Sequence, residues 1–277
     1  MAGQWPQRHV PGFDRAARID TRLPHAARVY DYWLGGKDNF AADRDAAEEA
    51  IAANPGIVAD VRANRAFLTR SVRYLASECG ISQFLDIGTG LPAASNTHEV
   101  AQAADPAARV VYVDNDPVVL THARALLTSG PAGRCDYVYA DVRDQATILR
   151  AAAGTLDLSR PVAVLLLLVL HLIPDADDPH LVVSSLLAAM PADSYLVLAH
   201  PASDIRTGAV AEMTRRMNQR LGGTKATMRD RATISRFFSG LELTEPGMVQ
   251  PQQWRPGPAE PGDPAEVTAW CGVARKP

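Results

Sequence analysis

Short apolar runs alternate with amphipathic stretches through the middle of the chain. The runs are rich in Val, Ile, Leu and aromatic residues and are bounded by Gly, Asp or Pro, which is typical of buried strands. The stretches between them leave room for crossover helices, so the strands are expected to run parallel with right-handed connections. The sequence therefore predicts an α/β fold with strands at about residues 83–87, 109–114, 136–140, 162–170 and 194–199.

Both ends of the chain depart from this alternation. Apolar residues recur at helical intervals from Val58 to Cys79, and Gly80 follows as a helix stop, so helices are expected before the first strand. After the fifth strand, the polar stretch up to Arg231 is expected to form an inserted helix over the sheet edge. The last two apolar runs, at 241–249 and 267–275, are separated by a Pro/Gly-rich loop without room for a crossover helix, and are expected to pair antiparallel.

The first strand ends in the glycine-rich turn Gly88-Thr-Gly90. Glycine at both positions removes the Cβ atoms that would hold a ligand away from the backbone amides. Asp86 stands inside this strand, whereas dinucleotide-binding strands are usually apolar here and place a pyrophosphate at a helix N-terminus. An acid at this position favours a cofactor that carries an amino group and no phosphate.

Two further carboxylates follow the next two strands. Asp114, followed by Asn115, lies at the carboxyl edge where open α/β sheets bind ligands, and it can accept both hydroxyls of a ribose. Asp141 can accept a hydrogen bond from the adenine amino group while the amide of Val142 faces the ring. Each acid alone could equally cap the helix that follows it. Their recurrence at three consecutive strand ends predicts a binding site for S-adenosylmethionine.

The glycine turn leaves other functions open. Gly88, Gly90 and Ala93 also fit the dinucleotide pattern of two glycines and a small third residue, and Asp114 lies at about the right distance beyond them. An NAD(P)-dependent oxidoreductase is therefore an alternative, as is a protein that binds S-adenosylmethionine without transferring its methyl group. A hydrolase or metalloenzyme is not indicated, because the sequence has neither a Gly-x-Ser-x-Gly motif nor a convincing metal-ligand cluster.

Four segments resemble the actinobacterial S-adenosylmethionine-dependent methyltransferase family once catalogued as a domain of unknown function. These are residues 27–40, 84–92, 111–117 and 238–247, of which the part around Gly35-Gly-Lys-Asp-Asn39 is the most family-specific. The resemblance spans nearly the whole chain, although Leu91-Pro92 replaces a glycine found in many methyltransferases. It implies a Rossmann-like class I sheet of five parallel strands plus a C-terminal antiparallel pair, with extra N-terminal helices. It also implies a cofactor pocket lined by Gly88, Gly90, Asp114, Asn115, Asp141 and Val142.

The family-specific segment suggests a lid over the methyl end of the cofactor. Tyr30 and Trp33 share one face of a helix, and aromatic faces attract a cation such as a sulfonium. Gly35 would end this helix and allow a hinge, and Asn39 offers a polar group to the cofactor or to the methyl acceptor. Alternatively, the two rings only pack the helix onto the sheet. We expect residues 1–80 to form an arm and helical lid on a Rossmann-like domain at 81–277, as one compact unit.

His171 is the candidate general base. It follows the central strand, where it can face the cofactor, and a base is needed only if the acceptor must lose a proton. His200, at the end of the next strand, has a weaker claim. Methyltransferases that act on DNA or protein amides carry an Asn/Asp-Pro-Pro-aromatic motif after the central strand, whereas this chain has Leu170-His-Leu-Ile-Pro174. The difference favours a small-molecule acceptor.

Composition bounds the partners and the compartment. With 28 basic and 31 acidic residues the net charge is −3, so we expect no nucleic-acid partner. The three cysteines are scattered, which indicates reduced thiols and a cytoplasmic protein. The N-terminus lacks a signal-peptide core, and the apolar run from Val162 to Ile173 is too short to span a bilayer, so no membrane partner is expected.

Overall fold

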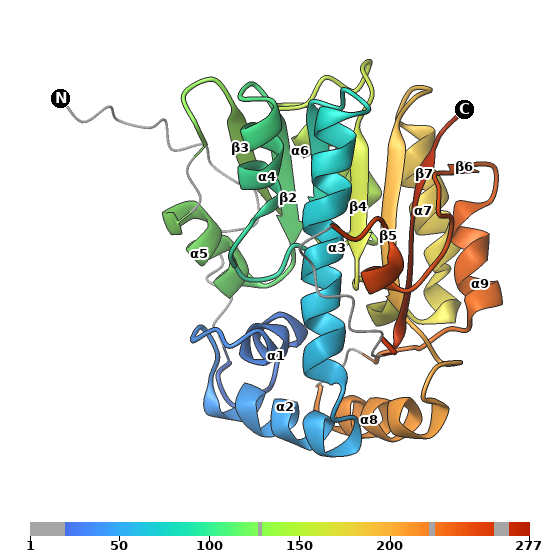
Figure 1. Ribbon diagram of the computed structural model, residues 1–277. Coiled ribbons are helices and arrows are strands. Elements are labelled where there is room, and N and C mark those ends of the chain that lie inside the picture. The colour runs from blue at the N-terminus through green and yellow to red at the C-terminus, as the bar shows by residue number, and fades with distance from the viewer. Residues whose placement is uncertain (1–19, 127–128, 222–224, 258–265) are drawn as a thin grey trace.

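A mostly parallel sheet forms the centre of the protein (Figure 1). The computed structural model describes residues 20–126, 129–221, 225–257 and 266–277. Within these residues seven strands form one sheet in the order β3-β2-β1-β4-β5-β7-β6. The strands are β1 (Gln83–Ile87), β2 (Arg109–Asp114), β3 (Arg134–Tyr139), β4 (Ala163–Leu167), β5 (Tyr195–Pro201), β6 (Glu242–Leu243) and β7 (Ala269–Arg275).

The strand pairing confirms the predicted layout. β1 pairs in parallel with β2 and β4, with Phe84 beside Val110 on one side and Ala163 on the other. β2 pairs in parallel with β3, and β4 with β5. β7 then runs antiparallel between β5 and β6. This is the five-stranded parallel sheet with a C-terminal antiparallel pair that the family resemblance implies.

The C-terminal run expected at 241–249 is interrupted. β6 ends at Leu243, and the chain leaves the ladder through a turn that contains Pro246 and Gly247, the latter with a φ of +83°. It returns at Val249, which forms an isolated antiparallel bridge with Cys271. Proline has no N–H to give to a ladder, so one continuous strand cannot form across this segment.

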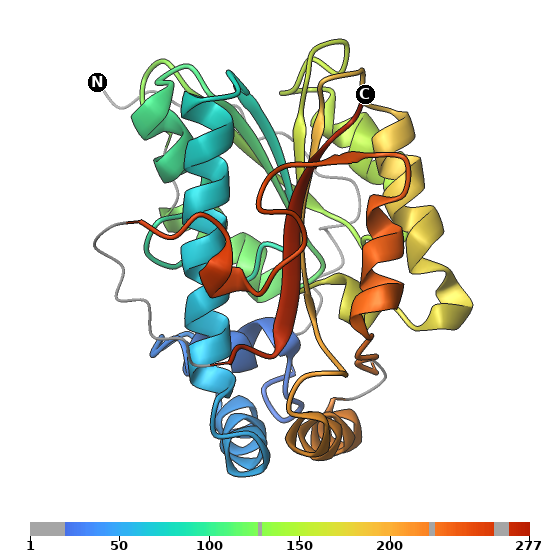
Figure 2. The ribbon, with the colours of Figure 1, turned by 45° about the vertical axis from the view of Figure 1, so that its right-hand side comes forward.

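Helices cover both faces of the sheet, which explains why its central strands are apolar on both sides. Leu85 and Ile87 pack into one core layer with α6 and α7, and Phe84 packs into the opposite layer with α3 and α4. Figure 2 shows α3 and α7 on opposite sides of the sheet. The helices are α1 (Ala26–Trp33), α2 (Ala41–Ala53), α3 (Ile57–Ser77), α4 (Thr97–Ala104), α5 (Pro117–Leu126), α6 (Gln145–Ala152), α7 (Pro179–Ala188), α8 (Thr207–Arg220) and α9 (Arg231–Ser235).

Helices α1, α2 and α8 lie together beyond one end of the strands, and we call them the cap (Figure 1). Met213 and Met217 of α8 share an apolar cluster with Ala46 and Ala50 of α2. The amide of Asn54, just after α2, contacts the Met213 sulfur at 3.8 Å. The cap therefore unites segments from the two halves of the chain. Residues 1–19 of the expected N-terminal arm lie outside the described residues.

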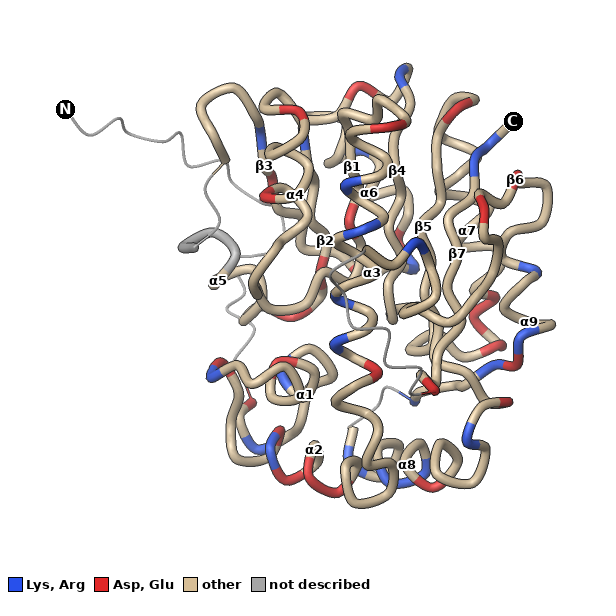
Figure 3. Tube along the Cα trace, in the orientation of Figure 1, with Lys and Arg blue, Asp and Glu red and all other residues tan. Residues whose placement is uncertain are grey.

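Acidic and basic residues are interspersed along the cap helices α2 and α8 (Figure 3). In α8, Glu212 pairs with Arg215 at 2.8 Å and with Arg216 at 2.7 Å. Arg220 of α8 pairs with Glu49 of α2 across the cap. In the described ranges, every helix is either too short or too polar to cross a bilayer.

Candidate active site

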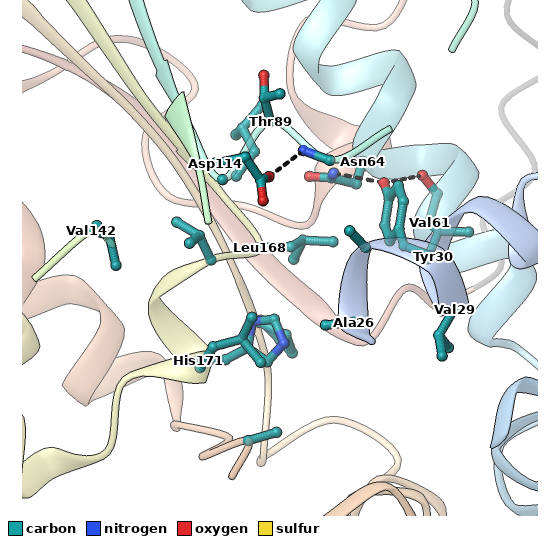
Figure 4. Close-up of a pocket in the computed structure, with 18 of the residues that line it drawn as sticks. Ala26, Val29, Tyr30, Val61, Asn64, Thr89, Asp114, Val142, Leu168 and His171 are labelled. Carbon is teal, nitrogen blue, oxygen red and sulfur yellow. Dashed lines mark hydrogen bonds between the residues drawn. The ribbon is translucent and has the colours of Figure 1, made fainter. Parts of the chain in front are cut away.

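A cavity of about 270 Å³ lies between the cap and the ends of strands β1 to β5. Figure 4 shows side chains from the sheet, from α1 and from α3 converging on it. Its polar part is formed by residues that follow β1, β2 and β3, and its apolar part by the cap, α3 and the segment after β4. Of the residues proposed from the sequence, the cavity is lined by Tyr30, Trp33, Asp86, Gly88, Gly90, Asp114, Asn115, Asp141, Val142 and His171.

The glycine turn after β1 depends on the absence of side chains. Gly88 has a φ of +74° and Gly90 a φ of +68°, in the left-handed region that other residues rarely adopt. A Cβ atom on Gly88 would lie 2.6 Å from the Val169 side chain, whereas a Cβ on Gly90 would meet nothing within 4 Å. The first glycine is therefore required for packing, and the second keeps the cavity open.

Alanine substitutions should separate these two roles. Gly88→Ala is expected to lower the free energy of unfolding by about 2 kcal/mol or more, from backbone strain and the collision with Val169. Gly90→Ala is expected to cost only the strain, about 1 kcal/mol, and to weaken S-adenosylmethionine binding. Thermal denaturation and calorimetric titration measure the two effects. Equal stability losses, or unchanged affinity in Gly90→Ala, would contradict this assignment.

Asp114 fastens the glycine turn to the end of β2. One carboxylate oxygen accepts the backbone N–H of Gly90 at 2.9 Å, and the other accepts that of Asp116 at 2.9 Å. Burial raises the pKa of Asp114, and these two hydrogen bonds oppose the shift. Because a carboxylate has about four acceptor positions, two remain for a ligand in the cavity.

Asp86 connects β1 to the helix that follows the turn. Its carboxylate accepts the hydroxyl of Thr97, the first residue of α4, at 2.6 Å. Burial raises the pKa of Asp86, and the hydrogen bond from Thr97 opposes the shift. One oxygen thus has a structural partner, and the residue also lines the cavity.

Asp141 is paired with Arg143. Arg143 contacts both of its oxygens, with Nε at 2.8 Å and Nη2 at 2.7 Å. These hydrogen bonds lower the pKa of Asp141 despite its partial burial. Asn115 approaches the same carboxylate at 3.5 Å, and Val142 lies beside the cavity (Figure 4). An adenine ring held here would share Asp141 with Arg143.

Tyr30 and Trp33 both line the cavity and both belong to the cap's apolar cluster. The Tyr30 hydroxyl donates to the Val61 carbonyl at 3.2 Å and accepts from the Asn64 amide at 3.0 Å (Figure 4). The Trp33 indole N–H donates to the Ala47 carbonyl at 3.3 Å. Tyr30 is thus anchored to α3 and Trp33 to α2, and both residues line the cavity.

Gly35 and Asn39 lie away from the cavity lining. Gly35, with a φ of +82°, follows the end of α1 as expected. Asn39 donates to the buried carboxylate of Asp31 at 2.9 Å, and the same oxygen accepts the backbone N–H of Asp38 at 3.0 Å. A Cβ on Gly36 would collide with Asp31. The family-specific segment therefore forms a turn around the buried Asp31 carboxylate. The turn supplies the hydrogen-bond donors that a buried carboxylate requires.

The sequence analysis did not identify the polar residues of α3 that line the cavity, Asp60, Asn64 and Arg65. Asn64 is buried, and its Oδ1 has no hydrogen-bond partner among the described residues. Arg65 donates to the carbonyls of Ala94 and Ser95 in the loop after β1, at 3.0 and 3.2 Å. The sequence signal that could have identified Asn64 is an amide side chain on the apolar face of a long helix. A buried polar side chain usually has a hydrogen-bond partner or a ligand.

His171 lies in a short 3-10 turn, Leu170–Leu172, after β4. Its imidazole points into the cavity (Figure 4), and its Nδ1 has no partner in the described part of the chain. Burial, together with the positive charge of Arg229, lowers the pKa of His171 to about 4. The ring is therefore neutral near pH 7, the state in which an imidazole can accept a proton.

His200 has a structural role instead. It is fully buried, with Nδ1 against the Pro201 carbonyl at 2.8 Å and Nε2 against the Arg229 guanidinium at 2.8 Å. Arg229, which the sequence analysis did not single out, also donates to the carbonyls of Leu170 and Ile173 at 3.1 and 2.8 Å. It thereby holds both ends of the turn that carries His171.

Known proteins identify this architecture. The family model described as S-adenosyl methyltransferase matches residues 13–277. A DUF574 family protein from Streptomyces avermitilis is 43% identical, with a TM-score of 0.90, over 94% of this chain and 100% of that chain. A candidate methyltransferase from Thermobifida fusca is also 43% identical, with a TM-score of 0.84, over 93% of this chain and 96% of that chain. No curated protein matches the sequence.

A more distant structure shares the fold alone. The plantazolicin methyltransferase BpumL, solved with S-adenosylhomocysteine, is 12% identical, with a TM-score of 0.52, over 91% of this chain and 96% of that chain. The family match decides between the cofactor classes that the glycine turn had left open. The chain belongs to the S-adenosyl methyltransferase family and is an S-adenosylmethionine-dependent methyltransferase.

Proposed function

We propose that this methyltransferase acts on a small molecule, which binds in the cavity between His171 and the cap. The observation that carries the proposal is the position of the cap, because α1 and α8 line the cavity and α2 packs against both in one apolar cluster. A polymer would have to pass between helices that are held together by an apolar cluster and by ion pairs. The interspersed charges on α2 and α8 (Figure 3) also offer no continuous basic surface to a nucleic-acid backbone.

The residues of the polar part fit the cofactor. Asp114 has acceptor positions left for the ribose hydroxyls, and Val142 with Asp141 would hold the adenine. The unpartnered Oδ1 of Asn64 and the carboxylate of Asp86 would accept from the amino group. We assign further cofactor contacts to the backbone of Gly88 and Gly90, to Asn115, and to the faces of Tyr30 and Trp33.

The protein's own contribution to the reaction is alignment and proton removal. When bound, S-adenosylmethionine would supply an electrophilic methyl group on a sulfonium sulfur, with the thioether of S-adenosylhomocysteine as the leaving group. Holding the nucleophile in place and excluding water can supply about 7–11 kcal/mol in model systems. His171 would take the proton that a hydroxyl or amine nucleophile loses as its bond to the methyl carbon forms.

We further infer a cytoplasmic location and neither a nucleic-acid nor a membrane partner. The three cysteines are free, which suits a reducing compartment. The net charge of −3 supports the exclusion of nucleic acid.

Calorimetry and labelled-methyl transfer test this function. S-adenosylmethionine and S-adenosylhomocysteine are expected to bind, and NAD is not. With S-adenosylmethionine labelled in its methyl group and an extract of the source cells, the label is expected in the filtrate that contains only small molecules. Label retained with protein or nucleic acid would overturn the small-molecule acceptor. The Asp114→Ala protein serves as the control for transfer that does not depend on the site.

A further inference from the structure

The cavity next to the cap is lined by apolar side chains from three helices. Trp33 comes from α1, Ile57 and Val61 from α3, and Met213 and Met217 from α8. Residues that make apolar walls around a cavity favour a ligand whose own surface is apolar, because both surfaces then leave water. The polar part of the cavity, at the ends of β1 to β3, is the part that fits the cofactor.

Charged side chains at the apolar part already have partners. Among the described residues of α1, α3 and α8, Asp60 and Arg65 are the charged ones that line the cavity. Asp60 accepts from the Arg206 guanidinium at 2.7 Å and from the backbone N–H of Thr268 at 3.2 Å. Arg65 donates to two carbonyls of the loop after β1. A cationic acceptor would find the Asp60 carboxylate already paired with Arg206, and an anionic acceptor would have to compete with two carbonyls for Arg65, so the burial of either charge is unfavourable.

Flexible methionine side chains form one wall of the apolar part of the cavity. Met213 and Met217 lie one helical turn apart on α8, and Met228 lines the cavity from the segment after α8. Methionine is unbranched and polarisable, so a wall built from it can fit apolar ligands of different outline.

We propose that the methyl acceptor is an uncharged, mostly apolar molecule with a single hydroxyl or amine that meets His171. This assignment rests on the proposed function, because it places the acceptor in the same cavity. His171 supplies the polar contact: its ring is neutral and points into the cavity (Figure 4). During transfer the acceptor's O–H or N–H bond breaks, its proton goes to His171, and a bond to the methyl carbon forms as the methyl–sulfur bond breaks.

Two fluorescent probes test the charge requirement directly. N-phenyl-1-naphthylamine and 8-anilinonaphthalene-1-sulfonate have the same ring skeleton and differ by a sulfonate. With protein saturated by S-adenosylhomocysteine, we expect the neutral probe to bind at least about tenfold more tightly than the anionic one. Equal binding of the two probes, tighter binding of the sulfonate, or no binding of the neutral probe would overturn the proposal.

A substitution at Met228 locates the binding. Met228→Asp is expected to weaken the neutral probe about tenfold or more, because it places a charge in the apolar wall, while Met228→Leu leaves the affinity within about twofold. Unchanged probe binding in a Met228→Asp protein that still binds S-adenosylhomocysteine would contradict the site. If Met228→Asp does not fold, the comparison of the two probes on the unaltered protein still decides.

S-adenosylhomocysteine binding keeps this test separate from the proposed function. A protein that binds S-adenosylhomocysteine but not the neutral probe refutes the apolar acceptor and leaves the cofactor site intact. Failure to bind S-adenosylhomocysteine at all would instead refute the cofactor residues assigned above.

Discussion

Replacing His171 with asparagine is expected to lower kcat by about 100-fold while leaving the affinity for S-adenosylmethionine unchanged. General bases contribute about 10²- to 10⁴-fold, and a pKa of about 4 makes His171 a weak base, which places it at the lower end of that range. Steady-state rates with an identified acceptor, together with calorimetric titration of the cofactor, measure the two quantities.

His180→Asn is the matched control for this experiment. His180 stacks on Phe237 with ring centroids 4.2 Å apart and does not belong to the cavity lining, so its replacement should leave kcat unchanged. The pH dependence adds a second readout. Because His171 stays neutral well above its pKa, the unaltered enzyme should keep a level rate from about pH 6 to pH 8. A rate that climbs through this range and is insensitive to His171→Asn would show that the acceptor ionises without His171.

Asp114→Ala is expected to weaken S-adenosylmethionine binding about tenfold or more. Hydrogen bonds to a charged group are worth about 1.5–3 kcal/mol each, and Asp114 also holds the Gly90 N–H that orders the glycine turn. The substitution therefore removes both a ligand contact and the fastening of a ligand-binding loop. Calorimetry on the folded variant measures the loss, and unchanged affinity would rule out the ribose contact.

Asp144→Ala provides the comparison at another strand end. Asp144 caps α6 by accepting the backbone N–H of Thr147 at 3.0 Å, and it does not line the cavity. Its replacement is expected to cost about 1 kcal/mol of stability, as the loss of a helix cap usually does, with no change in cofactor affinity. The pair separates an aspartate that binds a ligand from one that caps a helix.

The parts of the molecule that depend on local pattern were predictable from the sequence. Apolar runs closed by Gly or Asp placed β1 and β2 at the residues where the structure has them, and β3 and β5 within two residues. The same pattern located Asp86, Asp114 and Asp141, because the carboxyl ends of parallel strands must meet at one edge. The end of strand pairing after β6 could also have been predicted, since Pro246 lies inside the apolar run at 241–249.

Other features depend on contacts between distant segments. The sequence proposes Asn39 as a polar group for the cofactor or the acceptor, but it does not reveal that Asn39 donates to Asp31, which the turn at Gly35 brings close. Likewise, Arg143 neutralises Asp141 through a side-chain orientation that spacing does not reveal. Periodicity shows which helix face is buried but not what buries it, so the contact between α8 and α2 could not be derived from the sequence.

The cap also constrains how the chain must fold. Asn54 and Met213 are 159 residues apart in sequence yet touch in the cap. During synthesis, α1 and α2 leave the ribosome long before α8, because the segments that form β1 to β5 are made in between. Such non-local contacts slow folding, because the intervening chain must be ordered before they form. A partly made chain therefore exposes the apolar faces of α1 and α2, a surface that a chaperone which shields apolar side chains would recognise.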